Sequence, residues 1–412
     1  MVKYICERCG KGFFQKLHYD FHNKDKDLCD NNEHIPNKIT KNKKNLVIVD
    51  SKLKKLNNNK KNDFENINTN TYLDVNTEMN TNKHKSIKII KNKNLVAHSK
   101  LRVASMFAGC GGLDFAFHKE NNKFKVIYVN DFDKDSCNTY EKYYKFKPVC
   151  EDITQVKTIP DCDILTGGFP CQGFSVANSY RKEADNRNKL YLELVRLLKL
   201  KKPKYFIFEN VKGILSLGGY GNNEDKKNLK GKVFKMIVSD LEECGYQVNT
   251  KLFKLKWYDI PQNRERVIFV GIRNDISDKI NFNWPIENQE ITKTLKDAIG
   301  DLPIEYNEEI QHIGTKHKVK ITGYMGNRKL DWDKISPTIT GRGGGTGGPV
   351  INVHPSEKRR MTVREYARIQ TFPDDFTFEG SISSMYRQIG NAVPPKFSFI
   401  LADLLYELDT QL

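Results

Sequence analysis

The stretch "LRVASMFAGCGGLDFAFHKE" (residues 101–120) predicts the fold, because an apolar strand-like segment runs through a glycine cluster into a helix-forming segment. We expect a strand that ends in the glycines and a helix that begins after them. In this context a glycine loop lets the backbone approach a ligand closely. The loop lacks the full G-x-G-x-x-G spacing, so a dinucleotide is not implied.

The same alternation of strands and helices continues as far as residue 273. Further strands are expected at 125–131, 162–168, 204–210 and 266–273, and helices at 113–120, 133–144, 188–203 and 231–246. This pattern is typical of an α/β, Rossmann-like parallel sheet that is covered by helices on both faces and binds ligands at the carboxyl ends of its strands.

The alternation also divides the chain into regions. It is present over 101–274, it is lost over 275–355, and a helical pattern resumes within 356–412. We interpret 101–274 and 356–412 as one domain into which 275–355 is inserted as a smaller, irregular domain. Residues 35–100 read as a Lys/Asn-rich linker, and residues 1–34 as a separate module rich in Cys and His.

The charge of the chain favours a polyanionic partner, since 412 residues carry a net charge of +17 and the pI is about 9.2. Biased codon usage also enriches Lys and Asn, so charge alone leaves both explanations open. Residues 37–100 hold 15 Lys and 15 Asn against 5 acidic residues, a net +10, and too few apolar residues to fold. More than half of the net charge therefore lies in a predicted linker or disordered arm.

Two absences in the sequence indicate a soluble, cytoplasmic protein. The chain has no run of about 18 apolar residues, and its first residues are polar and basic rather than a secretory signal. The nine cysteines are odd in number and several lie in apolar runs, so reduced thiols are expected.

Acidic and aromatic residues follow the expected strands. Asp131 ends the second strand, where it can hold a ribose diol, and Phe132 beside it offers a flat surface for an adenine. Asp152 follows the next strand. Each residue has a simpler explanation as a helix cap or a core side chain, but together they favour a cofactor of the adenosine type.

Cys171 in "DILTGGFPCQGFS" (163–175) is the candidate nucleophile. It follows a strand of the same sheet, Pro170 stiffens the turn, and the surrounding glycines let a flat substrate approach. A free thiol is only a few per cent ionised at pH 7, so the site must supply positive charge or dipoles. The alternative is a small, buried, apolar cysteine.

Two further motifs favour the interpretation of Cys171 as a nucleophile over that of a buried, apolar cysteine. "FIFEN" (206–210) brings Glu209 to the end of a very apolar strand, where burial without a partner would raise its pKa and suit it to donate a proton. "IPQNRERVIFVG" (260–271) places Gln262, Arg264 and Arg266 at alternate positions, on one face of a strand. Arginines there can hold anionic or carbonyl oxygens, although a solvated edge is the usual explanation of such a pattern.

Taken together, residues 101–273 and 356–412 resemble the DNA cytosine-5 methyltransferases. The resemblance rests on the ordered motifs "FAGCGG", "GGFPCQGFS", "FENV", "QNRER", "RRMTVREYARIQTFPDDF" and "QIGNAVPP". It implies a methyltransferase sheet, a target-recognition domain over 275–355, and an S-adenosylmethionine-dependent attack on a cytosine that is flipped out of double-stranded DNA. The enzyme is expected to act as a monomer, and a separately encoded restriction endonuclease is a possible partner.

The resemblance also assigns roles to residues. Cys171 would attack ring carbon 6, Glu209 would contact ring nitrogen 3, and Arg264 would assist at the base. The implied cofactor contacts are Phe107, Ala108, Gly109, Gly111, Gly112, Asp131, Phe132, Asp152, Ile153, Pro170, Leu190 and Asn391. Two alternatives stay open: a tRNA-methylating relative, which "PCQGFS" disfavours, and a DNA-binding protein on an inactive scaffold, which intact Cys171, Glu209 and Arg264 disfavour.

The N-terminal module adds a metal prediction. Cys6 and Cys9 are separated by two residues, and His22 and Cys29 follow, a spacing close to that of a small zinc finger. The last gap is longer than usual, so His18 and His34 are alternatives for the fourth ligand. A finger of this size has almost no core, so its folding should depend on zinc.

Overall fold

The structure is a computed structural model that describes residues 4–5, 12–13, 99–170, 190–315, 327–341, 351–357 and 359–412. The chain divides into two units, Met1–Lys91 and Asn92–Leu412. In the first unit, β1 (Tyr4–Ile5) pairs antiparallel with β2 (Gly12–Phe13). The predicted zinc ligands Cys6, Cys9, His22 and Cys29, and the predicted linker up to residue 98, lie outside the described residues.

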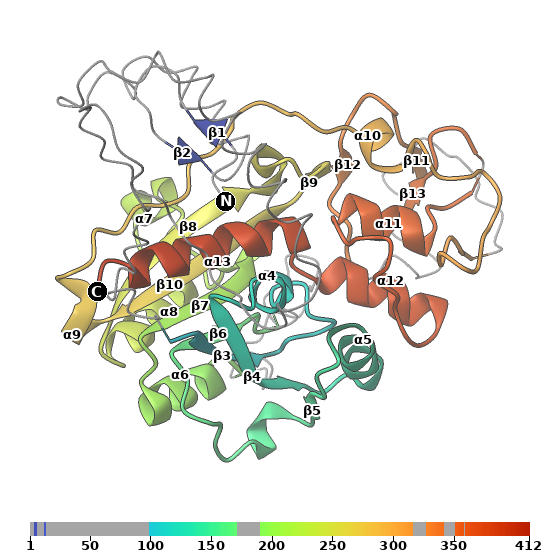
Figure 1. Cartoon of the computed structure of the whole chain (residues 1–412). Coiled ribbons are helices and arrows are strands. Elements are labelled where there is room, and N and C mark those ends of the chain that lie inside the picture. Colours follow the sequence, from blue (N-terminus) through green and yellow to red (C-terminus); the bar gives the residue numbers. More distant parts are fainter. Residues whose placement is uncertain are drawn as a thin grey trace, which may run out of the picture. The chain divides into compact units, whose positions relative to one another are not determined.

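A seven-stranded sheet of order β5-β4-β3-β6-β7-β10-β8 forms the centre of the second unit (Figure 1). Its strands are β3 (Leu101–Met106), β4 (Phe124–Asp131), β5 (Val149–Cys150), β6 (Ile164–Gly167), β7 (Tyr205–Val211), β8 (Tyr246–Lys254) and β10 (Glu265–Arg273). The neighbours from β5 to β7 are parallel, as the alternation of strands and helices predicted.

The prediction of a wholly parallel sheet was wrong at one edge. Strand β10 runs antiparallel to β7 on one side and to β8 on the other. Strand β8 was not predicted, because most of its residues are only half buried and several are polar. Since β10 is reversed, its first residues lie at the edge where the parallel strands end, and this brings the "QNRER" motif to the predicted site.

In β3 and β7, successive side chains pack alternately into two separate cores. In β3, Val103 packs into the core on one face and Ala104 into the core on the other. In β7, Ile207 packs into the first core and its neighbours Phe206 and Phe208 into the second. Side chains of a strand point alternately to opposite faces, so a run of apolar residues is what a sheet covered on both faces requires.

Helices supply the outer layers of both cores. On the first face lie α4 (Phe115–Lys119), α13 (Pro395–Asp409) and Tyr140 of α5 (Lys134–Tyr144); α13 crosses the front of the sheet in Figure 1. On the second face lie α6 (Leu190–Lys201) and α8 (Lys232–Glu242). The apolar spacing of α6 explains its orientation, because Leu194, Leu197 and Leu198 fall on one side of the helix and are all buried.

A third core lies beside the sheet and is built mostly from short elements. They are the helices α10 (Leu295–Ile299), α11 (Val363–Ile369) and α12 (Ile382–Asn391). Two short parallel strand pairs complete this part of the chain: β9 (Gln262–Asn263) with β12 (Ser336–Pro337), and β11 (Asn327–Lys329) with β13 (Ile351–Val353). Leu295 and Ile339 pack there with Tyr366 of α11 and Ile389 of α12. This core therefore contains side chains from both sides of the predicted domain boundary at residue 355.

The start of α11 is encoded locally by a capping box. Thr362 accepts a hydrogen bond from the backbone N–H of Glu365, and the Glu365 carboxylate accepts one from the backbone N–H of Thr362. The remaining short helices are α7 (Asn223–Lys227) and α9 (Asn274–Ser277), with 3-10 turns at Ile153–Gln155, Lys212–Ser216 and Leu255–Tyr258. Within the part of the chain that the structure describes, no helix has the length and apolar character needed to cross a membrane.

Candidate active site

The ends of β6 and β7 bring the predicted catalytic motifs side by side. Gly167 of β6 is the register partner of Phe208 of β7, so Gly168 follows the first strand next to Glu209 on the second. The chain then continues through Phe169 toward Cys171, which lies outside the described residues.

Glu209 is buried and has an ion-pair partner. The residue is 9% exposed, and Oε1 lies 2.5 Å from Nε of Arg266 on the antiparallel neighbour β10. A Cβ atom added to Gly168 would lie 3.2 Å from Oε2, so the second carboxylate oxygen faces the chain that leads to Cys171. The sequence suggested a carboxyl group buried without a partner; Arg266 corrects that expectation, because its positive charge stabilises the carboxylate.

Asn210 fixes the turn that precedes Pro170. Its side-chain Nδ2 donates a hydrogen bond of 3.2 Å to the carbonyl oxygen of Phe169, and its Oδ1 accepts one of 2.8 Å from the backbone N–H of Val211. The residue is 1% exposed, so water does not compete for these bonds. The amide therefore ties the end of β7 to the residue two places before Cys171.

The described cysteines offer no ionisable thiol beside Glu209. Burial raises the thiol pKa of four of them: Cys110, Cys137, Cys162 and Cys244. The pKa of Cys162 rises to about 12. The exposed Cys150 ends β5, four strand positions from β7, which is roughly 19 Å at about 4.8 Å per strand.

The "QNRER" motif is buried on one face, as its alternation predicted. Gln262, Arg264 and Arg266 are 0%, 1% and 7% exposed, whereas the intervening Asn263 is exposed. Buried arginines must find partners, because an unpaired buried charge is very unfavourable. The two arginines satisfy this requirement differently.

Arg264 joins the start of β10 to two distant segments. Its Nη1 donates to the carbonyl oxygen of Ile339 at 2.8 Å, and Nη2 donates to the carbonyl oxygens of Gly390 and Ala392 at 3.0 and 2.8 Å. Burial, and next the nearby Arg266, lower the pKa of this guanidinium. Its terminal nitrogens are thus engaged with backbone, while Arg266 forms the direct contact with Glu209.

The glycine loop after β3 combines close packing with one open position. Gly111 and Gly112 carry no side chain because a Cβ atom would overlap the rings of Tyr140 and Tyr144 in the first case and the carbonyl oxygen of Val393 in the second. Gly109 differs, since nothing lies within 4 Å of its added Cβ and its φ of +56° favours glycine. The loop therefore leaves room for a ligand at Gly109.

Asp131 connects this loop to the end of β4. Its Oδ2 accepts a hydrogen bond of 2.8 Å from the backbone N–H of Gly109, and its Oδ1 accepts one of 2.8 Å from Asp133. Burial raises the pKa of Asp131, and these backbone bonds act in the opposite direction. Next to it, Phe132 is 72% exposed, so its aromatic ring is accessible to a ligand.

The other predicted cofactor residues surround the same edge. Asp152 follows β5 and caps a 3-10 turn through Thr154, and Ile153 packs into the core on the second face, where Phe107 and Leu190 also pack. Ala108 donates its N–H to the carbonyl oxygen of Asn130 at 3.1 Å. Pro170 follows Phe169, and Asn391 ends α12, two residues before the Val393 carbonyl that meets Gly112.

A buried carboxyl group beneath the loop was not found from the sequence. Asp114 is fully buried and accepts hydrogen bonds from Ser105 Oγ at 2.8 Å and from the Tyr140 hydroxyl at 2.9 Å. Burial raises its pKa to about 6, against the effect of both bonds. In the sequence, "GLDFAF" reads only as a helix start, so nothing there marks the acid as buried.

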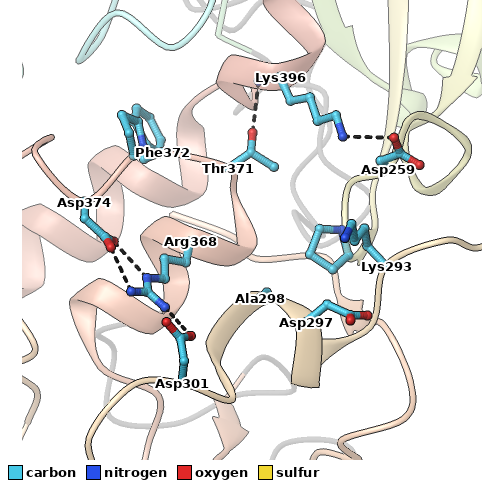
Figure 2. Close-up of a pocket in the computed structure, with 12 residues that line it drawn as sticks. Asp259, Lys293, Asp297, Ala298, Asp301, Arg368, Thr371, Phe372, Asp374 and Lys396 are labelled. Atoms are coloured by element: carbon cyan, nitrogen blue, oxygen red, sulfur yellow. Dashed lines mark hydrogen bonds and ion pairs between the residues drawn. The ribbon is translucent and has the colours of Figure 1, made fainter. Parts of the chain in front are cut away.

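An open pocket of about 530 Å³ lies on another part of the unit, between α10, the end of α11 and the start of α13 (Figure 2). Its charged groups are largely paired with each other: Arg368 with Asp301 and Asp374, and Lys396 with Asp259. None of the predicted catalytic or cofactor residues lines it.

Comparison with solved structures places the described fold in a class. The chain superposes on the Dnmt2 methyltransferase of S. pombe with a TM-score of 0.55 and 21% identity, covering 75% of this chain and 100% of that one. It superposes on the methyltransferase EhMeth of Entamoeba histolytica with a TM-score of 0.57 and 20% identity, covering 75% and 98% of the two chains. The mixed seven-stranded sheet is thus an α/β methyltransferase fold.

Comparison of sequences is more specific. The chain is 35% identical over 331 residues to the type II methyltransferase M.NgoFVII of Neisseria gonorrhoeae, covering 72% of this chain and 84% of that relative. It is 36% identical over 352 residues to the type II methyltransferase M.BsuRI of Bacillus subtilis, covering 72% and 77%. Residues 101–407 match the C-5 cytosine-specific DNA methylases, and the chain belongs to that family.

Proposed function

We propose that this DNA cytosine-5 methyltransferase transfers a methyl group from S-adenosylmethionine to a flipped-out cytosine in a specific DNA sequence, as the modification enzyme of a restriction-modification system. The observation that carries the proposal is the arrangement at the ends of β6 and β7. The buried carboxylate of Glu209 faces Gly168, and Asn210 holds the carbonyl of Phe169, directly before the Pro170–Cys171 sequence. The type II relatives support the restriction-modification context.

In the proposed reaction the Cys171 thiolate adds to ring carbon 6 of the cytosine, and carbon 5 becomes nucleophilic. S-adenosylmethionine, when bound, supplies the electrophilic methyl group. The proton at carbon 5 then passes to water, its bonding pair re-forms the double bond between carbons 5 and 6, and the cysteine leaves as the free thiolate. A base inside a stacked duplex cannot be reached by such a nucleophile, so the cytosine must be flipped out.

Glu209 and the arginines would hold the base during these steps. In this proposal Glu209 contacts ring nitrogen 3 through a shared proton, because the carboxylate and this nitrogen are both acceptors, and Arg266 sets the orientation of the carboxyl group through the 2.5 Å ion pair. Arg264, assigned to the base by resemblance, has its terminal nitrogens on three carbonyl oxygens. We therefore propose that Arg264 assists mainly by shaping the site, and that Arg266 is the arginine next to the base.

The residues at the carboxyl ends of the parallel strands fit an adenosyl cofactor. Gly109 leaves open space beside the loop, Asp131 fixes that loop through its backbone N–H, and Phe132 offers an exposed ring for an adenine. Asp152, which follows β5, and Asn391, which ends α12, would add polar contacts to the cofactor. We propose that these residues, with Phe107 and Leu190 as apolar contacts, hold S-adenosylmethionine.

The remaining predictions concern parts outside this edge. We propose that residues 275–355 read the target sequence, that the enzyme acts as a monomer on double-stranded DNA, and that a separate endonuclease recognises the same site. The N-terminal zinc site stays a prediction; the pairing of Tyr4–Ile5 with Gly12–Phe13 is compatible with it, since Cys6 and Cys9 lie between these strands in the sequence. Zinc content of the purified protein, before and after a chelator, tests it.

One experiment separates the candidate functions. The protein is incubated with radiolabelled S-adenosylmethionine and either duplex DNA or tRNA. We expect label in DNA alone, and a sequencing method sensitive to 5-methylcytosine should place every methyl group within one short sequence. Label in tRNA alone would contradict the proposal, and label in neither nucleic acid would favour an inactive, DNA-binding scaffold.

A further inference from the structure

Gln370, the residue after α11, makes three side-chain hydrogen bonds. Its Nε2 donates to the carbonyl oxygens of Ile389 and Ala392 at 2.7 and 3.1 Å. Its Oε1 accepts a hydrogen bond of 2.7 Å from Nε2 of Gln262. Gln370 is 0% exposed, so this amide is committed to the backbone at the end of α12 and is not available to a ligand.

Thr371 has an unusual backbone conformation for its type. Its φ is +69°, in the left-handed region that a β-branched residue rarely adopts. Its hydroxyl oxygen accepts a hydrogen bond of 3.0 Å from the backbone N–H of Lys396 in the first turn of α13 (Figure 2). Strained residues persist where their surroundings hold them, and they gather at functional sites.

The two neighbouring side chains therefore hold both ends of one short segment. Gln370 binds Ile389 and Ala392, and Thr371 binds Lys396, so residues 389–396 are anchored at their start and at their finish. In the sequence, Asn391 lies between Ile389 and Ala392, whose carbonyl oxygens Gln370 binds.

This segment also packs directly against the glycine loop. A Cβ atom on Gly112 of that loop would overlap the carbonyl oxygen of Val393. On another side of the segment, a Cβ atom on Gly390 would overlap the backbone of Thr340. A shift of the segment by even a fraction of an ångström would thus be transmitted to the loop after β3, because interiors packed this closely do not deform continuously.

We propose that Gln370 and Thr371 are positioning residues for the cofactor: together they clamp residues 389–396 so that Asn391 and the glycine loop keep the geometry that binds S-adenosylmethionine. The inference rests on the proposed function, because it assumes that Asn391 and the loop hold this cofactor. Both side chains bond to other groups of the protein, so the clamp should affect cofactor affinity rather than the chemical step.

The test uses the full chain and four variants. Gln370→Met keeps the shape of the side chain but removes its donors. Thr371→Val removes only the hydroxyl acceptor, and Thr371→Asn restores an acceptor in a residue that tolerates a positive φ. Arg368→Gln is the matched control, since it removes two exposed ion pairs of the same helix without touching residues 389–396.

Binding of S-adenosylmethionine is measured by calorimetry without DNA, and methylation is measured at saturating cofactor. Losing one to two such hydrogen bonds should weaken binding by about three- to tenfold in Gln370→Met and Thr371→Val. The kcat at saturating cofactor should stay within about twofold of the wild type. Thr371→Asn should recover most of the affinity, and Arg368→Gln should bind as the wild type does.

The outcomes separate the clamp from the proposed function. If the wild type binds no S-adenosylmethionine, the proposed function fails before any variant is compared. If the wild type binds it, and folded Gln370→Met and Thr371→Val bind equally well, only the clamp is wrong. Equal weakening by Arg368→Gln would also overturn the clamp, because it would show general loosening of the segment. If Gln370→Met does not fold, Thr371→Val and its rescue by Thr371→Asn decide.

Discussion

Asp114 should make folding depend on pH, and Asp114→Asn should remove that dependence. In the folded protein, burial raises the pKa of this carboxyl to about 6, from an ordinary value of 3.8. The protonated form is thus favoured by folding. The stabilisation is fully present below pH 3.8 and is lost as the pH rises through about 6, so the wild type loses this contribution on going to neutral pH.

The magnitude follows from the two pKa values. A difference of about 2.2 pH units corresponds to about 3 kcal/mol in full, of which about 2 kcal/mol is present at pH 4.5 and almost none at pH 8. An asparagine does not titrate, and it can still accept a hydrogen bond from Ser105 and donate one to the Tyr140 oxygen. The variant should therefore lack this change with pH.

The assay is urea unfolding of the wild type and the variant at pH 4.5 and pH 8. We expect the free energy of unfolding of the wild type, relative to that of Asp114→Asn, to be about 2 kcal/mol larger at pH 4.5 than at pH 8, so that the wild type is relatively more stable at the lower pH. All other groups titrate in both proteins, so their effects cancel in the comparison. A difference that is independent of pH would refute the argument that this carboxyl is desolvated without a compensating positive charge.

Three further predictions test the site. Arg266→Met should lower the free energy of unfolding by about 3 kcal/mol, because it leaves the Glu209 carboxylate buried without a partner. Adding Glu209→Gln to this variant should recover much of the loss in urea unfolding. No recovery would mean that the ion pair is not what stabilises the site. Asn210→Leu should reduce kcat at least about tenfold, with little change in cofactor affinity, because it removes the hydrogen bond to the Phe169 carbonyl oxygen. An unchanged kcat would mean that Asn210 does not position the segment that carries the nucleophile. A chain starting near Asn94 should keep its target sequence but bind DNA more weakly and with a shallower salt dependence; a changed target sequence would mean that residues 1–93 read bases.

The sequence was informative wherever the structure depends on local pattern. Runs such as "KYFIFEN" predicted strands because Phe206, Ile207 and Phe208 fill cores on both faces. The alternate burial of Gln262, Arg264 and Arg266 was also predicted, but their place in a single strand was not correct, because Gln262 lies in β9, Arg266 in β10 and Arg264 between these strands. The order of these elements also predicted that their ends meet at one edge.

What the sequence could not predict depends on direction and on distant contacts. Alternation of strands and helices does not reveal the direction of a strand, so the reversal of β10 and the pairing of Arg266 with Glu209 were missed. The partners of Arg264 are carbonyl oxygens 75 to 128 residues away, and a carbonyl leaves no mark in a sequence. The same holds for Gln370, whose role appears only once α12 is in place.

The most direct test of the central claim is the mapping of a covalent adduct. DNA that carries 5-fluorocytosine at the target position blocks the loss of the group at carbon 5, so the enzyme should remain attached after methyl transfer. Peptide mapping of the complex should then place the base on Cys171, and Cys171→Ser should form no adduct while still binding S-adenosylmethionine. An adduct on another residue, such as Cys150, or an adduct that persists in Cys171→Ser, would contradict the account.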